Sequence, residues 1–278
     1  MQRQPWFEIH DSSRFPKSLR DRVTEALEAV WNANQTYRPI AGRLRAALQQ
    51  AGTHCVVDLC SGGGGPWPSL YPELADGEPL TVRLTDRSPS DLLAGGGAHG
   101  RLEPVPDSVD ARAVPPSLHG FRTIFSSFHH FNPPEARAML EDAFRQREGI
   151  AIFEAARRDA ATMALLIGVP VLGWRTAVAA RPVRWNRLFW TCVVPVVPLV
   201  LWIDGILSCL RSYSLDDMRE LTEGLEAADY AWQIGEEKSG RVAIRYLIGT
   251  PLRACSASSV SSRPASSELS AARADAPR

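Results

Sequence analysis

The sequence has little lysine and no net charge. Of its 31 basic residues only Lys17 and Lys238 are lysines, and 31 acidic residues balance them. This balance removes the overall electrostatic attraction to phosphate backbones, so no nucleic-acid partner is expected. The arginine-rich, lysine-poor composition is more readily explained by a GC-rich genome than by any chemistry.

The sequence has five cysteines, which show no regular spacing. The number is odd and no pair has C-x-x-C spacing, so neither a disulfide framework nor a zinc site is indicated and no metal is expected. The first ten residues lack the apolar core of a signal peptide. We therefore expect a protein of the reducing cytoplasm.

Long apolar runs are also missing, although the region of about 160–203 is unusually apolar. Its two runs, 163–174 and 188–203, are shorter than the roughly 18–20 residues of a membrane span, and Pro195 and Pro198 would break a helix in the second. Four arginines lie between the runs. Two interpretations stay open: an insertion that forms a lid over the domain, or peripheral membrane contact through 163–203. The oligomeric state is left open as well.

Alternating strand-like and helical segments indicate an α/β fold with a mostly parallel sheet. Apolar runs that predict strands, separated by helical stretches, lie at 55–60, 80–85, 121–131 and 149–154. Two further runs, 230–235 and 241–249, flank Lys238-Ser239-Gly240 and predict a hairpin at one edge of the sheet.

The chain divides into three parts. Residues 1–50 predict a helical cover, and 51–252 form the main domain, which contains the apolar insertion. Residues 253–278 are rich in serine without apolar periodicity, so we expect a disordered tail there.

A buried strand that runs into a glycine turn is the strongest motif, Val56 to Gly65. Glycine lets the backbone approach a ligand and adopt positive φ without a Cβ clash. The dinucleotide motif G-x-G-x-x-G needs a third glycine where Trp67 stands, and a P-loop needs G-K-[ST], which is absent. A nicotinamide-dependent oxidoreductase is therefore kept only as an alternative.

The run Asp58-Leu-Cys-Ser-Gly-Gly-Gly-Gly resembles the first motif of class I S-adenosylmethionine-dependent methyltransferases. In that motif an acidic residue and two variable positions precede glycines on alternate places. The resemblance implies a seven-stranded sheet, S-adenosylmethionine as cofactor, and cofactor contacts from Asp58, Cys60, Gly62 and Gly64. Cys60 stands where the family often has glycine.

Later segments continue this resemblance in the same order. It implies that Asp86, at the end of the second strand, accepts hydrogen bonds from the ribose hydroxyls. It also implies that Asp110 and Ala111 face the adenine, with Asp107 as the competing register. Ser127 belongs to a fourth-strand motif whose end faces both cofactor and acceptor.

Two adjacent histidines, His129 and His130, follow that strand. Imidazole, with an ordinary pKa of about 6.5, suits a general base near neutral pH. A histidine in this place can equally bond to a backbone carbonyl and orient the loop. Both interpretations stay open for each residue.

Asp204 and Arg211 emerge from the second apolar run. Buried charges need partners, so an ion pair between them is expected. Such a pair could lock the insertion onto the domain or contact the acceptor.

Together these features predict methyl transfer from S-adenosylmethionine to a small, apolar acceptor at an O, N or C atom. The alternative on the same fold is a non-catalytic module that binds the cofactor or a partner.

Overall fold

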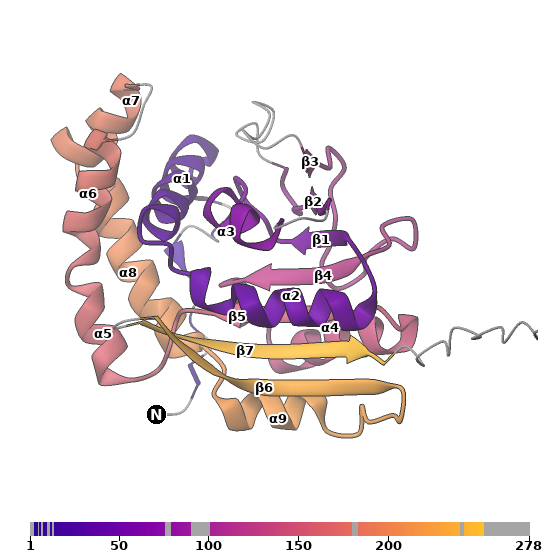
Figure 1. Ribbon diagram of the computed structural model, residues 1–278. Coiled ribbons are helices and arrows are strands. Elements are labelled where there is room, and N and C mark those ends of the chain that lie inside the picture. Colours follow the sequence, from indigo (N-terminus) through magenta and orange to yellow (C-terminus); the bar gives the residue numbers. More distant parts are fainter. Residues whose placement is uncertain are drawn as a thin grey trace, which may run out of the picture.

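A central sheet lies between two layers of helices in the computed structural model (Figure 1). The structure describes residues 3–4, 6, 8–9, 12, 14–75, 79–89, 101–179, 183–239 and 242–252. The predicted disordered tail, 253–278, lies outside these residues.

Seven strands form the sheet. They are β1 (Cys55–Leu59), β2 (Thr81–Leu84), β3 (Leu102–Pro104), β4 (Phe121–Phe125), β5 (Ile150–Glu154), β6 (Tyr230–Ser239) and β7 (Val242–Pro251). Their order is β3-β2-β1-β4-β5-β7-β6, and β7 is antiparallel to both of its neighbours. Of these strands, β1, β4 and β5 are short runs rich in β-branched and aromatic residues. The predicted mostly parallel seven-stranded sheet with a C-terminal hairpin is confirmed.

Two details of the strand prediction are wrong. The strand expected over 121–131 ends at Phe125, because Ser126 has a φ of 44° and residues Phe128–His130 form a 3-10 helix, η4. The short edge strand β3 was not predicted, since three residues carry too little periodicity to recognise.

Helices cover both faces of the sheet, which explains why Val56 and Val57, neighbours on β1, are both fully buried. One face packs against α2 (Ala41–Ala51) and α3 (Trp67–Leu74). The other packs against α4 (Pro133–Gln146) and α9 (Leu215–Thr222). The N-terminal helix α1 (Lys17–Ala33) lies beyond the carboxyl ends of the strands, at one side of α3 (Figure 1).

Local sequence explains where several helices begin and end. Asn132 and Glu135 form a capping box before α4, and Ser214 and Asp217 form one before α9. Gly52 ends α2 with a φ of 60°, a conformation that glycine adopts without strain.

The apolar insertion follows β5, and its described regular elements are all helices. It contains α5 (Ala160–Leu166), α6 (Val169–Ala179), α7 (Trp185–Leu188), a π-helical turn η5 (Phe189–Val193) and α8 (Val196–Arg211). It stands beside α1 (Figure 1), and α8 packs on Val23 of α1 through Val197, Val200 and Leu201.

Among the described helices none is by itself long and apolar enough to cross a membrane. Two bent pairs pass the test together: α5 with α6, bent by 43°, and α7–η5 with α8, bent by 66°.

Candidate functional site

The glycine turn joins the ends of the first two strands. Cys60, Gly62, Gly64 and Gly65 all have positive φ, and the amide of Gly62 donates to Oδ2 of Asp86 at 3.0 Å. The turn and the acidic residue, 24 positions apart, are therefore in direct contact. Cys60 has a φ of 59°, which costs a non-glycine residue about 1–2 kcal/mol.

Asp58 lies beneath this turn in the sheet. Its side chain is 1% exposed, and Oδ1 accepts a hydrogen bond from Thr123 of β4 at 2.6 Å. Burial raises its pKa to about 7, against the opposing effect of its hydrogen bonds with Thr123 and Ser61. Asp58 thus ties β1 to β4 and lines the base of the site.

Asp110 comes to the same site from the loop after β3. Its carboxylate is held by Arg112, with Nη2 to Oδ2 at 2.6 Å, and this hydrogen bond lowers its pKa to about 2. The amide of Val109 donates to the carbonyl of Asp86 at 3.0 Å, so the two acidic segments lie side by side. Asp107, the competing register, is exposed.

A cavity of about 760 Å³ collects most of these residues. Its lining includes the predicted cofactor residues Asp58, Cys60, Gly62, Asp86, Asp110, Ala111 and Ser127. Gly64 bonds within the turn, from its amide to the carbonyl of Ser61. The far side is lined by His129, His130 and, from the insertion, by Leu166, Val169 and Leu201. Motifs spread over more than half of the chain therefore surround one space.

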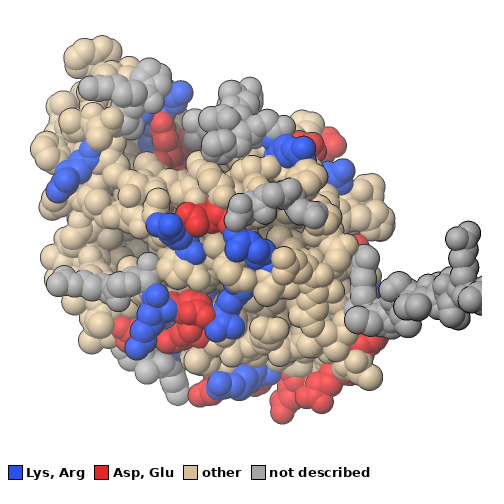
Figure 2. Space-filling model, viewed as in Figure 1, with Lys and Arg blue, Asp and Glu red and all other residues tan. Residues whose placement is uncertain are grey.

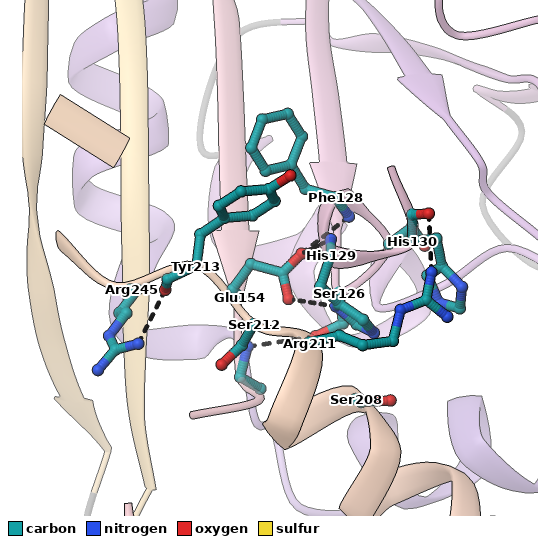
Figure 3. Close-up of polar contacts among 12 residues, drawn as sticks. Ser126, Phe128, His129, His130, Glu154, Ser208, Arg211, Ser212, Tyr213 and Arg245 are labelled. Atoms are coloured by element: carbon teal, nitrogen blue, oxygen red, sulfur yellow. Dashed lines mark hydrogen bonds and ion pairs between the residues drawn. The ribbon is translucent and has the colours of Figure 1, made fainter. Parts of the chain in front are cut away.

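His129 is fixed at the bottom of this far side (Figure 3). Its Nδ1 lies 2.7 Å from Oε2 of Glu154, the last residue of β5, which also accepts from the amide of Phe128 at 2.8 Å. On the other side, Nε2 lies 3.2 Å from Oε1 of Glu8. All three side chains of this His–Glu–Glu group are at most 2% exposed.

The carboxylates of Glu154 and Glu8 raise the pKa of the His129 imidazole. Burial by itself would lower the pKa of His129, but Glu154 and Glu8 outweigh it and raise the pKa to about 10. At neutral pH the ring therefore holds its second proton. His130 differs, because its ring is 22% exposed, lines the cavity and lies 3.7 Å from Oε2 of Glu8.

The end of α8 completes this group. Ser208 donates to Oε1 of Glu8 at 2.9 Å, and Arg211 donates to the carbonyl of His130 at 2.8 Å (Figure 3). The structure gives Asp204 and Arg211 separate partners in the N-terminal segment. Asp204 accepts from the amide of Ile9 at 2.7 Å, and Arg211 lies 3.8 Å from Glu8.

Known proteins resemble this chain in fold, whereas comparisons of its sequence find no match. No protein-family model matches the sequence, and no curated protein matches it. Solved structures do match the folded chain. The plantazolicin methyltransferase BpumL, solved with S-adenosylhomocysteine, is 9% identical, with 87% of this chain and 92% of that chain covered and a TM-score of 0.53.

This chain has the class I methyltransferase fold. Human N-acetylserotonin methyltransferase, solved with S-adenosylmethionine, matches at 11% identity, covering 90% of this chain and 63% of that one, with a TM-score of 0.48. An O-methyltransferase family protein from Burkholderia thailandensis matches at 15% identity, covering 86% and 62%, with a TM-score of 0.44. The chain spans somewhat less than two thirds of the length of these two proteins.

Several residues of the site were not predicted from the sequence. Glu8 and Glu28 belong to the N-terminal cover, and Glu154 ends an apolar run. The only sequence signal was an acidic residue standing within or beside an apolar run. Such residues are common at helix and strand ends, so the signal is weak.

Glu8, His129 and His130 also present ligand-type atoms within 4.8 Å of one another. Among the described groups, however, the two buried carboxylates of Glu8 and Glu154 are matched by two cations, Arg211 and the His129 imidazolium. A divalent ion would have to displace the proton from His129 beside a guanidinium.

Glu28 of α1 caps the glycine turn. Its Oε1 accepts from the amides of Gly63 at 2.7 Å and Gly65 at 3.1 Å. Burial raises the pKa of this carboxyl from 4.5 to about 8, although the two amides act in the opposite direction. The folded protein therefore retains a proton that the unfolded chain releases, and stability from this group falls as pH rises from about 4.5 to about 8.

Glu28→Gln should remove this pH dependence, because the amide oxygen still accepts from the turn and cannot ionise. We expect the melting temperature of the variant, relative to wild type, to rise by about 8–16 °C between pH 5 and pH 8.5, for about 4 kcal/mol. Differential scanning calorimetry measures this. Asp21→Asn, in an exposed pair with Lys17, is the control and should show no such trend. A pH-independent difference for Glu28→Gln would mean that Glu28 is already ionised in the folded state.

Proposed function

We propose that this protein transfers the methyl group of S-adenosylmethionine to a small, largely apolar acceptor, at an O, N or C nucleophile. The observation that carries the proposal is the single cavity, which has the glycine turn and acidic residues on one side and the histidines and apolar insertion on the other. Its volume of about 760 Å³ lies within the range of small-molecule sites, about 300–1,000 Å³. The fold, shared with a methyltransferase solved with S-adenosylhomocysteine, supports the cofactor assignment.

The residues at the cofactor side fit the ligand chemically. The positive φ values of the turn bring the backbone close to the cavity. Asp86 uses its two oxygens for the amides of Gly62 and Ser88, which leaves about two of its roughly four acceptor positions for ribose hydroxyls. Asp110 stays ionised beside Arg112 and can accept from the adenine amino group.

S-adenosylmethionine supplies an activated methyl group on a sulfonium, so the protein has mainly to align the acceptor and exclude water. Leu166, Val169 and Leu201 provide an apolar wall that desolvates the acceptor. This apolar wall belongs to the insertion, which follows β5 in the chain.

The two histidines take different roles in this proposal. His129 holds its proton at neutral pH and positions the loop by binding Glu154 and Glu8. His130, partly exposed to the cavity, is the candidate general base for an acceptor that must lose a proton.

Asp86→Ala tests the cofactor site. The change removes the acceptor for the ribose, so we expect affinity for S-adenosylhomocysteine to fall by about 1.5–3 kcal/mol, roughly tenfold or more. Isothermal titration calorimetry measures it. Asp107→Ala removes an exposed carboxylate on the neighbouring loop and is the matched control, with unchanged affinity. Wild-type affinity in Asp86→Ala would show that the ribose lies elsewhere.

The same protein separates the alternatives. Stabilisation by S-adenosylhomocysteine and none by NAD in a thermal-shift assay argues against the oxidoreductase. Methylated product from a panel of apolar hydroxyl, amine and carbon acceptors distinguishes an enzyme from a non-catalytic module. Cofactor binding without turnover across the panel would favour the module.

A further inference from the structure

The insertion leaves an apolar surface uncovered. Of the thirteen exposed large apolar side chains among the described residues, eleven lie between positions 167 and 202. Six of them, which we call the outer face, lie on α6, α7 and η5: Val171, Trp174, Val178, Trp185, Phe189 and Val193. Exposed apolar residues scattered singly are normal, but a concentration of this kind marks a binding surface.

Helical spacing places the residues of the outer face in two rows, one on α6 and one on α7 and η5. On α6, Val171, Trp174 and Val178 follow one another at intervals of three and four residues and are 61%, 49% and 46% exposed. Trp185, Phe189 and Val193 repeat every four residues on α7 and η5, with Trp185 81% exposed. Residues at these intervals share one side of a helix.

The inner side of the same helices is already occupied. Gly173 and Ala177 of α6 are buried, and Val197 and Leu201 of α8 pack on α1. Because the buried α8 also carries Asp204 and Arg211, 4% and 5% exposed, its inner side cannot face lipid chains. The outer face is exposed, and an apolar face on helices that are packed on their other side suits contact at a surface rather than a membrane span.

The charged residues of the insertion indicate which kind of partner suits the outer face. No Asp, Glu or Lys occurs from residue 160 to residue 203, whereas four arginines do. Arg175 is exposed next to Trp174, and Arg184 is 47% exposed next to Trp185. Glu25 lies 3.6 Å from Arg184 and 3.4 Å from the buried Arg187, which leaves Arg175 as the more available cation. The edge of the molecule formed by α6 is mostly uncharged in Figure 2.

We propose that the outer face inserts shallowly into a membrane surface that carries anionic lipid headgroups. Tryptophan is enriched at the boundary between headgroups and chains, where its ring is buried and its N–H stays hydrated. Apolar side chains flanked by arginine are typical of helices that lie in this boundary. The proposal concerns the outer face alone and does not depend on the reaction in the cavity.

Vesicle flotation with the full-length protein tests it. We expect binding to vesicles of equal parts phosphatidylglycerol and phosphatidylcholine, and weaker binding to phosphatidylcholine alone. The double variant Trp174→Glu, Trp185→Glu should bind at least about tenfold more weakly, because it removes two large apolar contacts and adds repulsion. Arg175→Glu should weaken binding to the anionic vesicles only.

Leu252→Glu is the matched control, since Leu252 is an exposed apolar residue outside the insertion, 37% exposed. It should float like wild type. Unchanged thermal stabilisation by S-adenosylhomocysteine would show that the double variant is folded.

A second copy of the chain is the competing occupant. Light scattering that finds a wild-type dimer, a monomeric double variant and no flotation of either would overturn the membrane proposal in favour of self-association. Wild-type flotation by the double variant would overturn it as well.

Discussion

Gly62→Val is expected to abolish binding of S-adenosylhomocysteine, with affinity lowered by about 100-fold or more, at least about 2.7 kcal/mol. Gly62 has a φ of 59°, and a Cβ there would lie 3.0 Å from Thr24 and 3.2 Å from Glu28. A β-branched side chain is strained in this conformation. It would also displace the turn from Asp86, whose carboxylate accepts from the Gly62 amide. Calorimetric titration measures the loss.

Two further variants guard against simple unfolding. Gly62→Ala carries the smaller Cβ and should fold with a modest loss of stability while still weakening the cofactor. Gly42→Ala, on α2 with nothing within 4 Å of the new Cβ, should bind normally and gain about 0.5–1 kcal/mol. Normal binding by folded Gly62→Val would refute the cofactor assignment of the turn.

The second large effect is expected from Glu154→Ala, a loss of about 3–5 kcal/mol in the free energy of unfolding. Glu154 is fully buried and accepts from the amides of Phe128 and His129 and from the His129 ring. Its removal leaves these donors buried without their acceptor. Chemical denaturation measures the loss.

The pH dependence of that loss tests the ion pair itself. Because the folded pKa of His129 is raised to about 10 from 6.5, the pair stabilises fully below about pH 6.5, and this contribution is lost as pH rises towards 10. The destabilisation by Glu154→Ala should therefore be larger at pH 6.5 than at pH 9.5. Glu141→Ala, in surface pairs with Arg137 and Arg145, is the control and should cost less than about 1 kcal/mol. Equal losses at both pH values would mean that His129 is neutral.

Local sequence predicted most strands of the sheet, and it predicted the glycine turn and the acidic residue that the structure brings into contact. The glycine turn after Val56–Leu59 and the acidic end of the next strand are each encoded within about ten residues. A parallel sheet then brings the carboxyl ends of neighbouring strands to one edge. The resemblance to class I methyltransferases placed Gly62 and Asp86 at one site, and the structure shows them in contact.

The residues around His129 are brought together by contacts between distant parts of the chain, which no local sequence pattern encodes. Glu8 and Ser208 are 200 positions apart, and nothing in the sequence around either residue points to the other. Only the packing of the N-terminal segment and α8 against η4 brings Glu8 to His129. The protonation of His129 follows from that packing, so the sequence left the roles of the two histidines open.

The apolar insertion shows the same division. Its composition predicted helices whose apolar side chains are buried against the domain or against a partner, because burial removes apolar surface from water. Which side of α8 faces inward was decided by α1, whose Val23 packs on Val197, Val200 and Leu201, whereas Trp174 of α6 and Trp185 of α7 stay exposed. Periodicity defines the faces of a helix, but only the neighbouring elements determine which face is buried.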